Sequence, residues 1–172
     1  MVVQNERVAN NKRKIWNDEV KWCINNTLKI LYTNVDGLVS KLMEVRDLIR
    51  EKKPQVVCLT ETKLRNSITN DTLGFENYNV WRKDREGKQG GGVIILTNDK
   101  LQAKQIQMNN INKVEMVAVE VKAEEDVIIG NIYMPPVTST TTWEEDEYYK
   151  ALIEDTAQTT IRMLLQRIKI KE

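Results

Sequence analysis

The sequence predicts an α/β fold with a mixed sheet, and three features early in the chain point to it. An apolar run at residues 28–33 is followed by turn residues, and a second apolar run at residues 55–60 ends at Glu61. Between them, apolar residues recur at helical spacing from residue 38 to residue 49, and Pro54 stops that pattern. The order is strand, helix, strand, a unit that leaves its two strands parallel.

The remainder of the chain adds further strands and one helix. Short apolar or alternating runs predict the strands, and the last two pair antiparallel across an acidic turn. A capping box at Thr142 and Glu145 predicts a helix that runs to about Ile168, with acidic residues at its start and basic residues near its end. The strands are expected at residues 78–82, 93–96, 101–106, 114–121 and 127–133.

Three consecutive glycines, Gly90 to Gly92, precede the run at residues 93–96. A phosphate-binding loop is one interpretation, but such a loop needs a strand before it and a helix N-terminus after it. Here a strand follows. A tight hairpin between two strands is therefore the better interpretation.

The N-terminal residues 1–27 are mainly polar and charged, and we predict that they form an extension to a single domain at residues 28–172. The scattered apolar residues of this extension could form a short amphipathic helix, although a loosely held extension is favoured. These residues are Ile15, Trp16, Val20 and Ile24.

The composition is that of an ordinary globular protein of 172 residues, with 41% hydrophobic and 30% charged residues. The net charge of +1 excludes a global basic field, so any affinity for DNA must be local. Cys23 and Cys58 predict neither a zinc site nor a disulfide framework, which favours a reducing interior. Because no apolar run could span a bilayer and the N-terminus is polar, we expect no membrane partner and a soluble, intracellular protein.

Polar residues follow both strands of the strand, helix, strand unit. Asn34 and Asp36 come after the first strand and Glu61 after the second, and parallel strands end at the same edge of a sheet. An amide and two carboxylates suit Mg²⁺, which takes one or two protein carboxylates and completes its shell with water and phosphate oxygens. In the alternative interpretation, Asp36 caps the helix and Glu61 is merely solvated. Spacing alone leaves both interpretations open.

Three segments stand out in chain order: Asn-Val-Asp-Gly-Leu at residues 34–38, Val-Cys-Leu-Thr-Glu-Thr-Lys at residues 57–63, and Asn-Ile-Tyr-Met-Pro-Pro at residues 131–136. Together they resemble motifs of the endonuclease/exonuclease/phosphatase superfamily. Within it, they resemble the apurinic-type endonuclease domains of non-LTR retrotransposons.

This resemblance implies an endonuclease that acts on DNA with Mg²⁺ or Mn²⁺, with the nucleus as a plausible location. It also implies roles for individual residues. Glu61 and Asp36 would hold the metal, while Asn34, Asp36 and Tyr133 would be catalytic, with Tyr133 over the scissile phosphate. Without the two earlier motifs, Tyr133 would be interpreted as a half-buried aromatic residue of a strand.

Complete members of the superfamily continue with a Gly-Asp-x-Asn motif, a second catalytic aspartate and a terminal Asp-His pair. The resemblance covers about residues 28–165, contains none of these motifs, and the chain has no histidine. We therefore expect a truncated, catalytically incomplete domain derived from a retrotransposon. It would form one half of the two-sheet sandwich, with helices on one face of its sheet.

The other face of that sheet would be uncovered, and this would favour self-association. Two alternatives stay open at this point. One is a non-catalytic interaction protein that uses the exposed sheet face for dimer or partner binding. The other is an active enzyme that a second chain completes.

Overall fold

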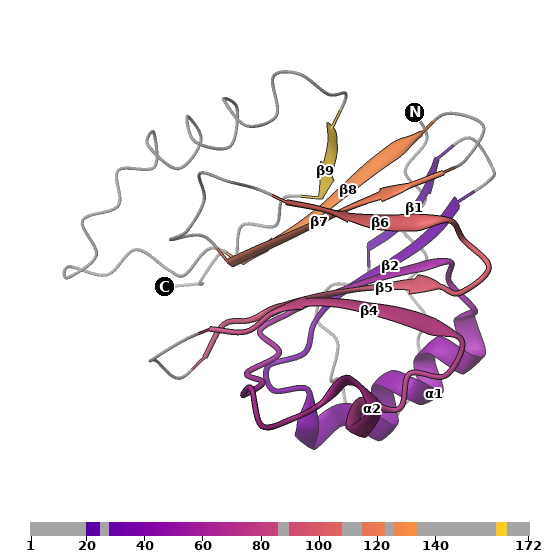
Figure 1. Ribbon diagram of the computed structural model, residues 1–172. Coiled ribbons are helices and arrows are strands. Elements are labelled where there is room, and N and C mark those ends of the chain that lie inside the picture. Colours follow the sequence, from indigo (N-terminus) through magenta and orange to yellow (C-terminus); the bar gives the residue numbers. More distant parts are fainter. Residues whose placement is uncertain are drawn as a thin grey trace, which may run out of the picture.

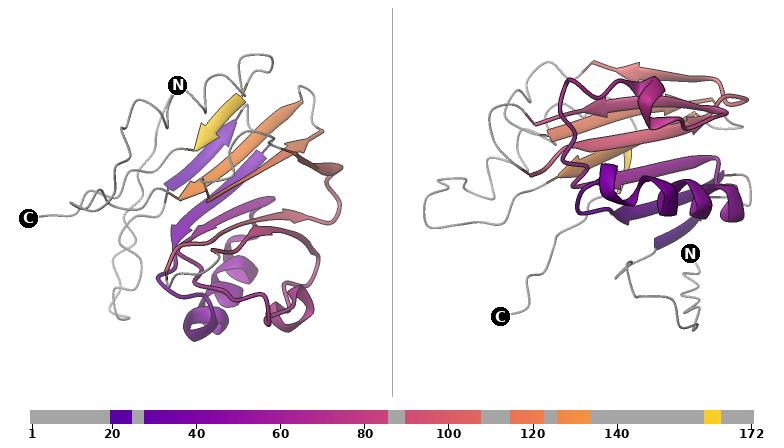
Figure 2. Two further views of the ribbon diagram at one scale, coloured as in Figure 1. Left: turned by 60° about the vertical axis from the view of Figure 1, so that its left-hand side comes forward. Right: turned by 90° about the horizontal axis from the view of Figure 1, so that it is seen from below.

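Two β-sheets pack face to face in a computed structural model of the chain, and two α-helices cover the outer face of the first sheet (Figure 1). The structure describes residues 28–85, 90–107, 115–122 and 126–133, and the backbone alone of residues 20–24 and 161–164. The layered arrangement is also visible from below in Figure 2. The α/β class expected from the sequence is confirmed.

The first sheet contains five strands in the order β1-β2-β3-β5-β4. The strand, helix, strand unit lies at its centre, where β2 and β3 are parallel as predicted, and the other neighbours pair antiparallel. The strands are β1 (Val20–Ile24), β2 (Leu28–Asn34), β3 (Val56–Thr60), β4 (Tyr78–Lys83) and β5 (Val93–Asn98). Strand β1 lies in the segment that the sequence assigns to the extension, so at least Val20–Ile24 belong to the sheet.

Helix α1 (Leu42–Lys52) follows a short 3-10 turn at Val39–Lys41 and packs on the first sheet through Val45 and Ile49. It ends where expected, because Lys53 adopts a left-handed conformation and donates its N–H to the Ile49 carbonyl just before Pro54. Helix α2 (Asn70–Leu73) is a single turn beside it. None of the described helices is long and apolar enough to cross a membrane.

The second sheet corrects our expectation of a single sheet. Its order is β6-β7-β8-β9, from β6 (Ala103–Ile106), β7 (Glu115–Val121), β8 (Val127–Tyr133) and β9 (Ile161–Leu164). Strands β7 and β8 pair antiparallel as predicted, but they leave the first sheet instead of extending it. Strands that are apolar on both faces must bury both faces, and a second layer achieves this.

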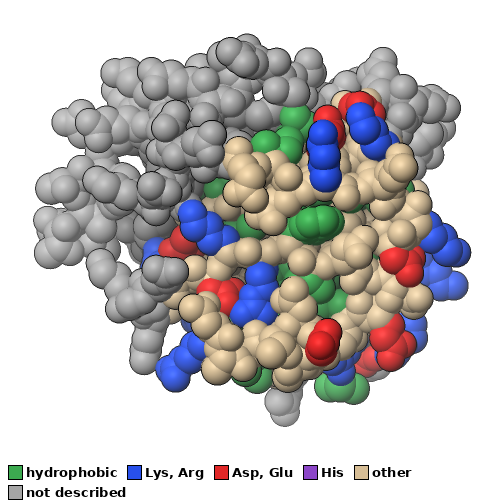
Figure 3. Space-filling view, in the orientation of Figure 1, with side chains coloured by type: hydrophobic (Ala, Val, Ile, Leu, Met, Phe, Trp, Pro, Cys, Tyr) green, Lys and Arg blue, Asp and Glu red, His purple; other side chains and the backbone are tan. Residues whose placement is uncertain are grey.

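A shared core fills the space between the sheets, so the sheet face that we expected to be uncovered is covered. Tyr32, Cys58 and Ile95 of the first sheet pack in one cluster with Val119 and Ile129 of the second. On the face seen in Figure 3, basic and acidic side chains are interspersed over the described surface and apolar areas are small. The large hydrophobic residues that are exposed among those described are Val39 and Met43, outside the sheets. The proposed surface for self-association is therefore wrong.

Strand β9 also differs from the prediction of a helix from Thr142 to Ile168. The backbone of Ile161–Leu164 pairs in parallel with β8, because long-range pairing has overridden the local helical pattern there. The rest of that predicted helix lies outside the described residues.

Candidate active site

One edge of the first sheet gathers the ends of three strands and the start of a fourth. The strand registers pair Asn34 with Thr60, Thr60 with Val93, and Val93 with Lys83. Glu61 follows Thr60 directly, so it lies at the same edge as Asn34. The sequence predicted this juxtaposition from the parallel strands, and the structure confirms it.

Asn34 connects the two strand ends through both atoms of its amide. Its Nδ2 donates a 3.1 Å hydrogen bond to Oε1 of Glu61, and its Oδ1 accepts a 3.0 Å hydrogen bond from the Asp36 N–H. The second bond is an Asx turn, which shapes the chain after β2. The first bond aims one oxygen of the Glu61 carboxylate. Asn34 therefore acts as a positioning residue for Glu61.

The loops after β2 and β3 are joined along their backbones. Gly37 donates its N–H to the Glu61 carbonyl at 2.8 Å, and Leu38 donates to the Thr62 carbonyl at 2.9 Å. Asp36 and Glu61 have positive φ angles of 43° and 53°, uncommon for residues other than glycine. Such conformations persist only where surrounding contacts hold them, and they cluster at functional sites. The two loops therefore form one rigid unit at the candidate site.

Asp36 is held by a cation that the sequence analysis missed. Its carboxylate pairs with Lys63, two residues after Glu61, and its side chain is 65% exposed. The hydrogen bond from Lys63 holds the pKa of Asp36 below its usual value. The same bond, together with the fields of Asp36, Glu61 and Tyr133, raises the pKa of Lys63. Lys63 thus pairs with Asp36 and also lies within the electrostatic influence of Glu61.

Tyr133 comes to this edge from the end of β8 in the second sheet, and it is 8% exposed. Burial raises the pKa of its phenol, and the negative charge of Glu61 raises it further, whereas Arg85 and Lys63 lower it. The charges of Glu61 and Lys63 thus act on Tyr133, and its catalytic role remains a prediction. The guanidinium carbon of Arg85 lies 5.3 Å from the centre of the Tyr133 ring.

Arg85 is itself fixed by Glu115, the residue opposite Tyr133 on β7. One oxygen of Glu115 pairs with Arg85 Nε, and the other accepts from the backbone N–H of Gly92. Both side chains are mostly buried. No local pattern predicts this group, because Arg85 and Glu115 lie 30 positions apart in the chain.

The glycine hairpin lies directly under this group. Strands β4 and β5 pair antiparallel, which confirms the hairpin interpretation. A Cβ atom on Gly91 would collide with Glu115 Oε2, and one on Gly92 would collide with Thr62 Oγ1. The three glycines also have positive φ angles of 90°, 67° and 85°. Glycine is therefore required here for close approach as well as for the turn.

Asn131 ties the second sheet to the first just behind the site. Its side chain is fully buried, and Nδ2 donates 2.8 Å hydrogen bonds to the carbonyls of Leu59 on β3 and Ile94 on β5. Because alternate residues of a strand face the same side, Tyr133 projects from the same face of β8 as Asn131. The sequence analysis missed this role for Asn131.

The donor set at this edge fits weak binding of a divalent cation. Among the described residues, no cluster of three or more His, Cys, Asp or Glu side chains could hold a metal. Two carboxylates, Glu61 and Asp36, are nevertheless the usual protein share of a Mg²⁺ site that keeps water and phosphate oxygens. Cys58 lies in the core between the sheets, where burial raises the pKa of its thiol to about 12. The metal roles of Glu61 and Asp36 remain predictions.

Comparison with known proteins places these features in a family. Residues 31–165 match the model of the endonuclease/exonuclease/phosphatase family. The chain belongs to this family. Its domain is of the endonuclease/exonuclease/phosphatase type.

Two relatives illustrate the likeness. The probable RNA-directed DNA polymerase from transposon X-element of Drosophila melanogaster is 30% identical over 129 residues, which cover 74% of this chain and 14% of that protein. The probable RNA-directed DNA polymerase from transposon BS, also of Drosophila melanogaster, is 25% identical over 114 residues, which cover 66% of this chain and 13% of that protein. This chain thus matches a small part of each relative.

Two solved structures show the fold. The endonuclease domain of TRAS1, a telomere-specific non-LTR retrotransposon, superimposes with a TM-score of 0.52 at 15% identity, over 75% of this chain and 54% of that chain. An AP endonuclease from Archaeoglobus fulgidus gives a TM-score of 0.52 at 23% identity, over 75% of this chain and 49% of that chain. This chain therefore spans about half the length of these two structures.

Proposed function

We propose that this family domain binds DNA and a divalent cation, Mg²⁺ or Mn²⁺, at the edge formed by Asn34 and Glu61. The observation that carries the proposal is the Asn34 to Glu61 hydrogen bond, which aims a carboxylate at the edge where Tyr133 also ends. Asp36 would supply the second carboxylate. The bound metal would polarise a phosphate oxygen of the DNA. A DNA substrate is compatible with a nuclear location and with descent from a retrotransposon.

Each side chain then has a definite task. Asn34 holds the orientation of Glu61. Lys63 neutralises Asp36 in the free protein, and it becomes available for a phosphate oxygen once Asp36 contacts a metal. Tyr133 keeps its proton at neutral pH because burial and Glu61 raise the pKa of its phenol, so it donates a hydrogen bond to the phosphate.

We further propose that these residues bind the phosphodiester without hydrolysing it. The chain contains no histidine, the residue that most often serves as a general base. Glu61 and Asp36 would be committed to the metal, and Glu115 is bound to Arg85 and Gly92, so none of these three carboxylates remains to activate water. Losing the base together with the positioned nucleophile removes most of the rate enhancement of a hydrolase.

Metal binding by the full chain is tested by isothermal titration with MnCl₂. Glu61→Gln should weaken binding, and the double change Asp36→Asn with Glu61→Gln should abolish it, because both carboxylate charges are then lost. Glu44→Gln is the matched control, since Glu44 is exposed on α1. Equal affinity in the double variant and the wild type would remove this edge as the metal site.

Hydrolysis is tested with supercoiled plasmid and MgCl₂. The chain alone should nick no faster than the double variant, and adding the C-terminal half of a related complete domain should restore nicking. Metal-dependent nicking by the chain alone that the double variant loses would keep the metal site and overturn the proposed lack of hydrolysis.

A further inference from the structure

A polar pocket lies next to the candidate site, along the edge of strand β4. Its cavity volume is about 440 Å³, within the usual size range of ligand sites. One wall is the segment that follows Glu61, and the other is the end of β4. The lining residues are Asn66, Ile68, Thr69, Asn70, Arg82 and Asp84.

The strand register sets the distance between this pocket and the site. Thr60, which precedes Glu61, pairs with Val93 on β5, and Val93 pairs with Lys83 on β4. Lys83, the neighbour of Arg82, therefore lies two strands away from Thr60. Two strand spacings are about 10 Å. That corresponds to about three base steps along one strand of DNA. A nucleic acid held at Glu61 can therefore reach the pocket.

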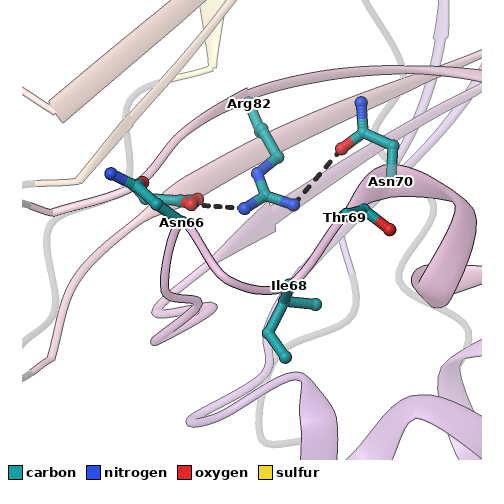
Figure 4. A pocket seen from close by; sticks show the side chains of 6 residues that line it. Asn66, Ile68, Thr69, Asn70 and Arg82 are labelled. Atoms are coloured by element: carbon teal, nitrogen blue, oxygen red, sulfur yellow. Dashed lines mark hydrogen bonds and ion pairs between the residues drawn. The ribbon is translucent and has the colours of Figure 1, made fainter.

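Arg82 forms the rigid centre of the pocket. Its Nη1 donates to Oδ1 of Asn70 at 3.2 Å, and its Nη2 donates to the Arg65 carbonyl at 3.3 Å and to the Asp84 carboxylate. Figure 4 shows the Arg82 guanidinium between Asn70 on one side and Asn66 on the other, with Ile68 below it. The Arg82 side chain is only 13% exposed, so its role is to hold Asn70 and Asp84 in place at the wall of the pocket.

Asp84 brings a buried acceptor to the wall of the pocket. Its side chain is 7% exposed, one oxygen pairs with Arg82, and Oδ1 accepts no hydrogen bond from any described residue. A buried polar atom without a partner costs free energy, and an incoming donor relieves that cost after a small shift of the side chain. The exocyclic amino group of a nucleobase is such a donor.

The remaining lining groups complete a set that suits the edge of a base. The Oδ1 atom of Asn70 is used by Arg82, which leaves its amide NH₂ as a donor. Asn66 is exposed and makes no hydrogen bond within the described part of the chain, so its whole amide is available. Ile68 adds an apolar contact.

Phosphate and metal ions fit this pocket less well. The Arg82 donors that would bind a phosphate are occupied by protein oxygens, and the Asp84 carboxylate repels an anion. A cation would meet the guanidinium that already neutralises Asp84. A planar, neutral group with donors and acceptors at its edge matches the set.

We propose that this pocket binds one unstacked nucleobase with an exocyclic amino group, from a DNA strand whose phosphate lies at Glu61. The amides of Asn66 and Asn70 contact the edge of the base, and Ile68 contacts it through apolar atoms. The inference rests on the proposed function, because the Glu61 edge anchors the same strand. This proposal gives a base preference to a domain that would otherwise contact only the sugar-phosphate backbone of DNA.

Three ten-nucleotide, 5′-fluorescein-labelled strands test the proposal by fluorescence anisotropy with the full chain: oligo-dC, oligo-dT and a strand of abasic sites. All three carry the same backbone charge. Oligo-dC should bind at least about five-fold tighter than the abasic strand, as expected for the hydrogen bonds of one base edge. It should also bind tighter than oligo-dT, which lacks the amino group.

Asn66→Ala should remove most of the preference for oligo-dC over the abasic strand, while Asn79→Ala, an exposed control on β4, should retain it. Because Asn66 is exposed, its truncation leaves the fold intact, which thermal unfolding verifies. The proposed base binding would be overturned by any of three results. These are equal affinity for the three strands, a preference that Asn66→Ala leaves unchanged, and no binding of any strand.

The metal titration keeps this proposal separable from the proposed function. If the double change Asp36→Asn with Glu61→Gln abolishes Mn²⁺ binding and no base preference is found, the pocket alone fails. If the wild type binds no Mn²⁺ but shows an Asn66-dependent preference for oligo-dC, the metal site alone fails.

Discussion

The side chain of Asn131 donates a 2.8 Å hydrogen bond to the carbonyl of Leu59, and this bond crosses between the two sheets. Each residue lies two positions before a candidate site residue: Leu59 before Glu61, and Asn131 before Tyr133. The bond therefore fixes the relative position of the strands that carry the carboxylate and the phenol. Its partner bond to Ile94 fixes the strand that begins after the glycine hairpin.

Replacing Asn131 should destabilise the fold. Asn131→Leu removes both hydrogen bonds and leaves two carbonyls without this donor, at a cost of about 1–3 kcal/mol. Asn131→Asp should cost more, because it buries a charge that faces two carbonyl oxygens. The free energy of unfolding from urea denaturation measures both effects, with Asn79→Ala as the exposed control. A loss equal to that of the control would show that Asn131 does not join the sheets.

Removing Lys63 should strengthen metal binding. Lys63→Met frees the Asp36 carboxylate, so Mn²⁺ no longer competes with an ammonium group, and affinity should rise several-fold in isothermal titration. Lys41→Met serves as the control, because Lys41 influences Asp36 only at longer range. Weaker binding in Lys63→Met than in the wild type would mean that the Asp36 to Lys63 pair does not oppose the metal.

Removing Arg85 should raise the pKa of Tyr133. The Arg85 cation over the ring favours the phenolate and lowers the pKa, whereas burial and the charge of Glu61 raise it. In Arg85→Met the lowering effect of Arg85 is lost, so the pKa should rise. Absorbance at alkaline pH, with the Tyr133→Phe variant subtracted, follows this phenol. Arg50→Met, which changes an exposed pair on α1, should leave the titration unchanged. A lower pKa in Arg85→Met would contradict the contact.

The glycines of the hairpin should differ in their tolerance of a side chain. Gly91→Ala combines a φ of 67° with a collision against Glu115, whereas a Cβ atom on Gly90 would lie 3.9 Å from Nη1 of Arg85, an ordinary contact distance. Both suffer backbone strain of about 1 kcal/mol. The additional loss in Gly91→Ala therefore isolates the collision and should appear as a lower urea midpoint. Equal midpoints would show that Glu115 moves aside freely.

The sequence by itself determined the centre of the fold and half of the candidate site. Apolar runs on both sides of a helical pattern favour a parallel pair with a crossover, and this pairing puts Asn34 and Glu61 at one edge. The hairpin at Gly90 to Gly92 and the antiparallel pair of β7 and β8 also followed from local patterns. Such features are predictable because the residues that decide them are neighbours in the chain.

The tertiary structure alone decided which surfaces meet. A strand that is apolar on both faces records that it is buried but not which layer buries it, so the second sheet over the first was missed. The pairing of Val20–Ile24 and Ile161–Leu164 was missed for the same reason. The contacts of Lys63 with Asp36 and of Arg85 with Tyr133 join residues 27 or more positions apart. Their choice of partner depends on strand register and sheet packing, which no local pattern encodes.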